Sequence, residues 1–152
     1  MNRYLGEIIR EFLNERMVFI GGPRQVGKAT LGISFLDQSN IKSAAYLNWD
    51  DLRSRALLKK AELPNDKILL IDEIHKYKNW RNLIKGFYDK RKDSQKFIVT
   101  GSARLDHYRR GGDSLLGRYR YLRLHPFSLA ELKNYSKQDL EQLLKFGGFP
   151  EA

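Results

Sequence analysis

The chain has no cysteine among its 152 residues. This absence excludes disulfide bonds, zinc sites built on cysteine and a thiol nucleophile. The three histidines, at positions 75, 107 and 125, show no metal-ligand spacing. Apolar runs stop at four residues, as in Met17–Ile20, whereas a membrane-spanning helix needs about 20. Charges interrupt residues 1–13, which excludes a signal-peptide core there. We therefore predict a soluble, cytoplasmic globular protein that makes no use of a membrane.

Acidic residues are scarce in the middle of the chain. The sequence holds 28 basic and 18 acidic residues, a net charge of +10, but residues 81–130 hold 12 basic residues and only 4 acidic ones. A local basic surface favours a polyanion such as nucleic acid or nucleotide phosphate. A solvated, solubilising face explains the same excess equally well. Charge alone leaves both interpretations open.

Short apolar runs alternate with segments of helical periodicity. The runs predict strands over 17–20, 44–49, 68–71, 97–100 and 119–124. The periodicity predicts helices over 3–13, 28–37, 80–88 and 137–146, one from Asp50 or Asp51 to about 60, and one opening at a capping box, Ser128–Glu131. Strands that are apolar on both faces indicate a parallel sheet covered on both sides. We predict an α/β fold, a three-layer sandwich with a mostly parallel central sheet.

A glycine-rich segment follows the first predicted strand. Gly22 to Lys28 fits the pattern G-x-x-x-x-G-K of a phosphate-binding loop, with a strand before it and a helix after it. Glycines let the backbone turn successive N–H groups toward phosphate oxygens, and the lysine reaches the β- and γ-phosphates. The predicted nucleotide-binding residues are Gly22, Pro23, Arg24, Gln25, Val26, Gly27, Lys28, Ala29 and Thr30.

This loop departs from its pattern at one position. The residue after the lysine is ordinarily Ser or Thr, whose hydroxyl ligates Mg²⁺, but here it is Ala29, with Thr30 next. Each step of one residue along an α-helix turns the direction of the side chain by about 100°. We therefore expect Thr30 to point away from the metal. Either a water replaces the hydroxyl or the substitution weakens the site. We predict that nucleotide binding survives and that Mg²⁺-dependent hydrolysis is reduced.

Two carboxylates follow the predicted strand 68–71. Asp72 and Glu73 lie where this strand ends, and ligands of open α/β sheets bind at the carboxyl ends of the strands. We expect Asp72 to hold Mg²⁺ and Glu73 to act as the general base toward the attacking water. Because phosphoryl transfer to a metabolite would not require Glu73, hydrolysis is the favoured reaction.

Hydroxyl groups end the next apolar run, at Thr100 and Ser102. We expect this strand to lie between the first strand and strand 68–71 in space. A hydroxyl at its end would contact the γ-phosphate or the attacking water. A simple glycine-bearing turn at Gly101 is the alternative.

Taken together, these motifs resemble a family of prokaryotic AAA-type P-loop ATPases, whose loop usually reads G-P-R-Q-V-G-K-T-T. The resemblance spans about residues 16–151. It rests on an ordered set of segments: Gly21–Lys28, Ile68–Trp80, Thr100–Ser102, Leu116–Arg118, Pro126–Ser128 and Gly147–Glu151. Ala29 departs from the family, which has Thr there.

The resemblance implies an additional-strand, AAA-like P-loop NTPase fold, ATP or ADP as ligand, Mg²⁺ as cofactor, and Thr100 or Ser102 as the sensor. Members commonly continue past the Gly-Gly-Phe-Pro segment into a separate region. We therefore expect residues 1–152 to form one P-loop ATPase domain that precedes such a region. The resemblance also makes Arg118 a candidate arginine finger or sensor, often supplied across a subunit interface of a homo-oligomer. A surface arginine is the alternative.

Arginines and tyrosines are interleaved over residues 104–123. This pattern suits phosphate contacts combined with base stacking on a single strand, or an acidic protein partner. The tyrosines of a strand over 119–124 would instead pack within the domain. We thus predict an ATP-hydrolysing domain and retain two alternatives: a nucleotide-binding switch or scaffold without efficient turnover, and an ATP-dependent DNA-binding module.

Overall fold

The computed structural model describes residues 3–102, 105, 115–132 and 135–150. In chain order the elements are α1 (Gly6–Leu13), β1 (Met17–Gly21), α2 (Lys28–Ile33), β2 (Tyr46–Asn48), α3 (Leu52–Lys60), β3 (Ile68–Asp72), η1 (Ile74–Lys76), α4 (Trp80–Arg91), β4 (Lys96–Thr100), β5 (Tyr119–Arg123), η4 (Leu129–Glu131) and α5 (Lys137–Phe146).

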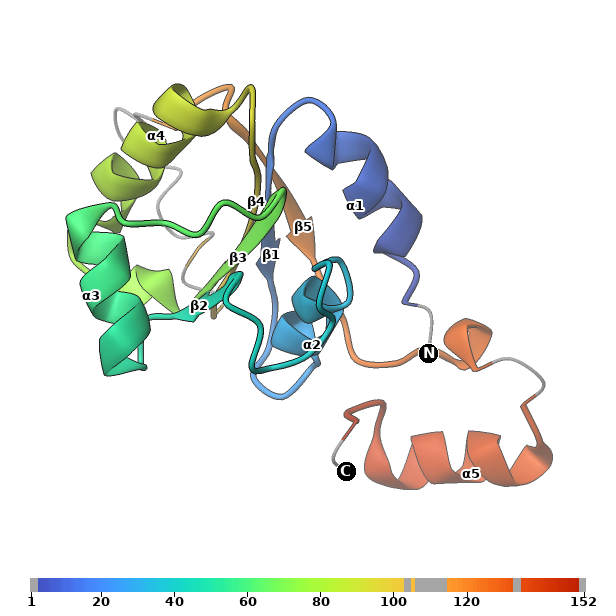
Figure 1. Ribbon diagram of the computed structural model, residues 1–152. Helices are drawn as coiled ribbons and strands as arrows, with labels where there is room; N and C mark the ends of the chain where they lie inside the picture. The colour runs from blue at the N-terminus through green and yellow to red at the C-terminus, as the bar shows by residue number, and fades with distance from the viewer. Residues whose placement is uncertain (1–2, 103–104, 106–114, 133–134, 151–152) are drawn as a thin grey trace.

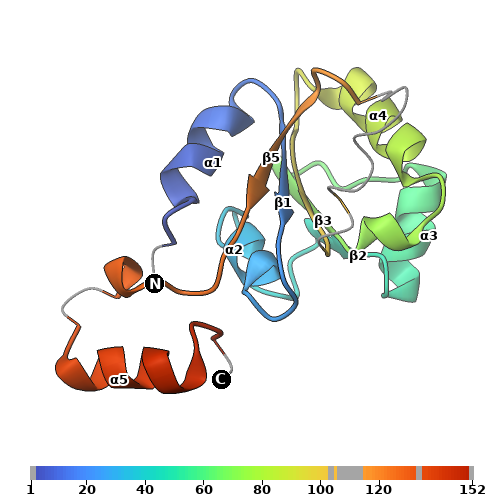
Figure 2. The same cartoon turned by 180° about the vertical axis from the view of Figure 1, so that it is seen from behind.

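The five described strands form one parallel sheet in the order β2-β3-β4-β1-β5. Strand β4 lies between β1 and β3, as expected for an additional-strand P-loop fold. Helices α1 and α2 cover one face of the sheet, and α3 and α4 cover the other (Figures 1 and 2). The predicted α/β three-layer sandwich is confirmed. Because the carboxyl ends of β1, β3 and β4 meet at one edge, the loops that follow these strands are neighbours.

The central strands form the core. Every residue of β1 is buried, and so is all but the first residue of β3 and of β4. Phe19 stacks on Tyr119 of β5 at 4.4 Å between ring centroids and contacts Trp80 of α4 at 5.9 Å. Burial on both faces explains why these strands are apolar at successive positions rather than alternating.

Several predicted elements differ from the structure, and helix α1 begins at Gly6 rather than at residue 3. Helix α2 ends at Ile33 rather than at 37, where bonds from Phe35 to Gly32 and from Leu36 to Ile33 tighten the chain into turns. Strand β2 has three residues instead of six. The capping box at Ser128 is present, but it opens only the single turn η4. Asp51, one of the two predicted candidates, caps α3 by accepting from the Ser54 N–H at 2.8 Å.

Among the described residues, none of the helices has both the length and the apolar character that a membrane span requires.

Candidate nucleotide site

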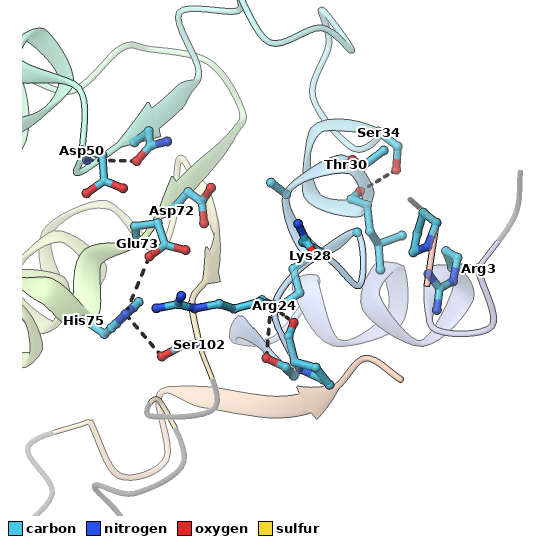
Figure 3. A pocket seen from close by; sticks show the side chains of 18 of the residues that line it. Arg3, Arg24, Lys28, Thr30, Ser34, Asp50, Asp72, Glu73, His75 and Ser102 are labelled. Atoms are coloured by element: carbon cyan, nitrogen blue, oxygen red, sulfur yellow. Dashed lines mark hydrogen bonds and ion pairs between the residues drawn. The ribbon is translucent and has the colours of Figure 1, made fainter. Parts of the chain in front are cut away.

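A cavity of about 1320 Å³ opens at the carboxyl ends of the central strands. The predicted loop residues line it, except Val26, and so do Asp72, Glu73 and Ser102. Figure 3 shows Lys28, Asp72 and Glu73 around the same space. The cavity is also lined by residues that no motif singled out for a role: Arg3, Leu31, Ser34, Asn48, Asp50, His75, Lys76, Phe127 and Pro150.

The loop conformation depends on its two outer glycines. Gly22 has φ +142° and Gly27 has φ +91°, values that favour glycine. A Cβ at Gly22 would lie 2.3 Å from the Leu124 carbonyl oxygen, so a side chain there has no room. These glycines let the backbone curl in front of α2, which begins at Lys28.

Lys28 is held at the loop by its own backbone. The Nζ donates to the carbonyl oxygens of Gly22, at 3.1 Å, and Pro23, at 2.5 Å. Burial lowers the pKa of this ammonium, and the charges of Glu73 and Asp72 oppose that shift. The three charged groups are therefore close enough to influence one another.

The position directly after Lys28 lacks the hydroxyl expected there, since it is Ala29. Ala29 lines the cavity but has no donor oxygen, and Thr30, which also lines it, is exposed. Thr30 lies one residue further along α2, a step that rotates a side chain by about 100° around the helix axis.

Asp72 is a buried carboxylate with two hydroxyl donors. Thr100 donates to Oδ1 at 2.6 Å and Tyr46 donates to Oδ2 at 2.9 Å. Burial raises the pKa of Asp72, and these two hydrogen bonds oppose the shift. Burial and the neighbouring Asp72 in turn raise the pKa of Tyr46, which keeps its hydroxyl proton for this bond. The network orients the carboxylate at the end of β3.

Glu73 occupies an unusual backbone position. Its φ of +59° lies in the left-handed region, and its N–H donates to the Thr100 carbonyl at 3.1 Å. Its Oε2 lies 3.3 Å from Lys76 Nζ and 3.7 Å from His75 Nε2. Strained backbone of this kind is concentrated at functional sites.

The two candidate sensor hydroxyls lie in different surroundings. Thr100 is completely buried and contacts Asp72. Ser102 lines the cavity, and its Oγ lies 3.3 Å from His75 Nε2, the same nitrogen that approaches Glu73 (Figure 3). Ser102 is thus linked to the acidic pair through His75.

Arg3 joins the beginning of the chain to the phosphate loop. Its guanidinium donates to Glu131 Oε1 at 2.8 Å, to the Val26 carbonyl at 3.0 Å and to the His125 carbonyl at 2.5 Å. It also lies 4.0 Å from the centre of the Phe127 ring. Burial disfavours ionisation of Glu131, but hydrogen bonds from Ser128 and Arg3 outweigh it and lower the pKa of the carboxyl. This buried ion pair holds Arg3 at the cavity wall, where it binds the Val26 carbonyl of the loop.

Arg118 lies away from the cavity. It precedes β5, and its carbonyl accepts from the N–H of Met17 at the start of β1, whereas the phosphate loop follows the end of β1. Its Nε donates to Asp89 Oδ1 of α4 at 2.8 Å. A five-residue strand, at about 3.3 Å per residue, separates Arg118 from the loop of the same chain.

The described part of the basic stretch packs against the domain. Tyr119 stacks on Phe19, the Tyr121 hydroxyl lies against Gly21, and Arg120 lies 5.5 Å from the centre of the Phe12 ring. Residues 103–104 and 106–114, with Arg104, Tyr108, Arg109 and Arg110, lie outside the described residues. Packing within the domain is the interpretation that Tyr119 and Tyr121 favour.

A glycine loop connects β1 to α2 and shares the cavity with an acidic pair at the end of the buried strand β3. This arrangement defines the P-loop nucleotide-binding class. A family model described as an AAA domain matches residues 14–133, most of the chain. The chain therefore belongs to this AAA family, which confirms the resemblance seen in the motifs and makes it a nucleotide-binding, ATPase-like domain of a family that often oligomerises. No curated protein matches the chain.

Sequence reasoning missed several residues of the cavity. Phe127 and Pro150 belong to segments that carry the resemblance, but their local pattern assigns them no role. The sequence marks Asp50 only as a candidate helix cap. Arg3 and Tyr46 carried no sequence signal, because each reaches the site from an element far away in the chain.

Proposed function

We propose that this domain binds ATP and hydrolyses it in a Mg²⁺-dependent reaction. The observation that carries the proposal is the convergence of the phosphate loop, Asp72, Glu73 and Ser102 on one cavity. Loop N–H groups and the Lys28 ammonium would bind the β- and γ-phosphates. Glu73 would accept a proton from the water that attacks the γ-phosphorus as the bond to the β–γ bridging oxygen breaks, releasing ADP and phosphate.

Thr100 and Ser102 lie in different surroundings, which favours different roles for their hydroxyls. Thr100, buried against Asp72, would orient that carboxylate. Ser102, at the cavity wall, would act as the sensor that contacts the γ-phosphate or the attacking water. This assignment chooses between the two residues that the sequence left open.

The residues present fit a Mg²⁺ ion that arrives with the nucleotide. Among the described residues, no group of three or more His, Cys, Asp or Glu side chains is arranged to hold a metal by itself. Mg²⁺ in such sites keeps several waters and is bound by one or two carboxylates together with phosphates. Asp72 is the carboxylate that would hold it, and Ala29 contributes no ligand. When bound, the ion would neutralise charge on the phosphate oxygens.

The test is a single-turnover hydrolysis assay on wild type, Glu73→Gln and Ala29→Thr, with nucleotide affinity measured in parallel. Glu73→Gln should keep its affinity for ATP and lose nearly all turnover, because the amide cannot accept the proton. Ala29→Thr should raise turnover by roughly 10-fold or more, since it restores a metal ligand. Equal turnover in wild type and Glu73→Gln would refute hydrolysis at this site.

A nucleotide-binding switch or scaffold without efficient turnover is the second candidate, and Ala29 is the observation that favours it. The two functions differ in one result. A switch predicts tight ATP and ADP binding with turnover no greater in wild type than in Glu73→Gln.

A homo-oligomer and a polyanionic partner are further proposals. Within the described part of the basic stretch, Arg120 and Arg123 of the edge strand β5 are exposed and would be available to DNA or to an acidic protein. Titration with single-stranded DNA at several salt concentrations tests the first partner, because phosphate contacts require a steep loss of affinity with salt.

A further inference from the structure

Lys76, the last residue of η1, binds two carboxylates at the wall of the cavity. Its Nζ lies 2.6 Å from Asp50 Oδ2, 2.8 Å from Asp50 Oδ1 and 3.3 Å from Glu73 Oε2. The hydrogen bond from Lys76 to Asp50 raises the pKa of the ammonium, and the bond to Glu73 adds to this effect. Lys76 therefore bridges the loop after β2 to the residue proposed as the general base.

The other end of this bridge is itself fixed. The N–H of Asp50 donates to Asn48 Oδ1 at 2.9 Å, and the next residue, Asp51, caps α3. The Asn48 amide also donates to the Tyr46 hydroxyl at 3.3 Å, and Tyr46 in turn donates to Asp72. The end of β2 thus supports both carboxylates of the acidic pair.

Holding Glu73 in this way limits its rotation. Its backbone N–H donates to the Thr100 carbonyl, and Lys76 and His75 both approach the same carboxylate oxygen, Oε2. Glu73 lines the cavity together with Lys28 of the phosphate loop, and Figure 3 shows it on the cavity side of His75. These contacts restrain Oε2 of a carboxylate that lines the cavity.

We propose that Lys76, anchored on Asp50, is a positioning residue that holds Glu73 in the orientation required for activating water. The proposal rests on the proposed hydrolytic function. A positioned base mainly affects the chemical step, so the loss of Lys76 should lower kcat more than it changes KM. An ordinary surface ion pair would affect neither turnover nor affinity.

The experiment compares wild type, Lys76→Met, Lys76→Arg, Asp50→Asn and the double variant Lys76→Met/Asp50→Asn in steady-state hydrolysis. Lys78→Met is the matched control, because Lys78 is an exposed lysine two residues away that does not line the cavity. Glu73→Gln sets the background. Thermal unfolding of every variant verifies folding, and a cycle of unfolding free energies over Lys76 and Asp50 measures their coupling independently of activity.

We expect kcat of Lys76→Met to fall by roughly 5- to 10-fold, the effect of about 1 kcal/mol on the transition state, with KM for ATP changed by less than about 2-fold. Asp50→Asn should give a smaller loss of kcat, the double variant no more than Lys76→Met alone, and Lys76→Arg should recover most of the rate. Lys78→Met should match wild type.

Unchanged or increased kcat in Lys76→Met, a change confined to KM, or no coupling between Lys76 and Asp50 would overturn the positioning role while leaving hydrolysis intact. Wild-type turnover equal to that of Glu73→Gln would instead overturn the hydrolytic function, and the positioning role with it.

Discussion

Removal of the Tyr46 hydroxyl, in the variant Tyr46→Phe, tests the hydrogen bonds around Asp72 most directly. In Tyr46→Phe, Oδ2 of Asp72 loses its 2.9 Å donor and the Asn48 amide loses its 3.3 Å acceptor, while Thr100 still donates to Oδ1. A hydrogen bond to a charged group contributes about 1.5–3 kcal/mol. Because Asp72 lines the cavity, water can partly replace the donor, and we expect a loss of about 1–2 kcal/mol in the free energy of unfolding at pH 7. For a chain of this length that corresponds to roughly 2–8 °C in Tm.

The loss should depend on pH in a defined direction. Burial raises the pKa of Asp72 in the folded protein, and the bond from Tyr46 opposes this shift. An acid with a raised folded pKa contributes stability that is complete below its unfolded pKa, about 3.9, and is lost as the pH rises through the folded pKa. Tyr46→Phe raises the pKa of Asp72 in the folded protein further. The difference in free energy of unfolding between wild type and variant should therefore be small near pH 4 and increase toward pH 7.

Urea unfolding of both proteins between pH 4 and pH 8, without nucleotide, measures this gap. Tyr88→Phe is the matched control, because its hydroxyl donates only to the Glu15 carbonyl at 3.4 Å in an exposed position. The control should lose only a few tenths of a kcal/mol at every pH. A Tyr46→Phe gap that stays constant from pH 4 to pH 8, or that equals the control, would refute the reasoning.

Three further predictions concern the loop support, helix α4 and the interface. Arg3→Met leaves Glu131 buried without its guanidinium, so denaturant unfolding should show a loss of about 3–5 kcal/mol; a loss below 1 kcal/mol would contradict the buried pair. Gly86→Ala should raise the free energy of unfolding by about 0.5–1 kcal/mol in the same assay, because a Cβ added at this helix position would meet nothing within 4 Å. A lower free energy of unfolding would contradict this. If Arg118 acts across an interface, mixing Arg118→Ala with Glu73→Gln should restore hydrolysis that neither has alone, whereas no restoration would favour its role as the partner of Asp89.

The local pattern was sufficient for most elements of the fold. Runs such as Ile68–Leu70 are apolar at every position, which requires a strand buried on both faces and hence a covered parallel sheet. The helix that begins at Lys28 was predicted too long, because its end depends on turns formed around Gly32 rather than on periodicity. At Ser128 the capping box was predicted, but Glu131 also binds Arg3, and the turn extends no further.

By itself the sequence determined the chemistry that meets at the cavity: a phosphate loop, an acidic pair and a nearby hydroxyl, each marked by residues close together in the chain. The tertiary structure decided which groups orient them. Tyr46 reaches Asp72 from 26 residues away, Lys76 reaches Asp50 across the same separation, and Arg3 binds Glu131 across 128 residues. Spacing encodes contacts within a loop or helix, whereas these contacts arise only when strand order brings distant segments to one edge of the sheet.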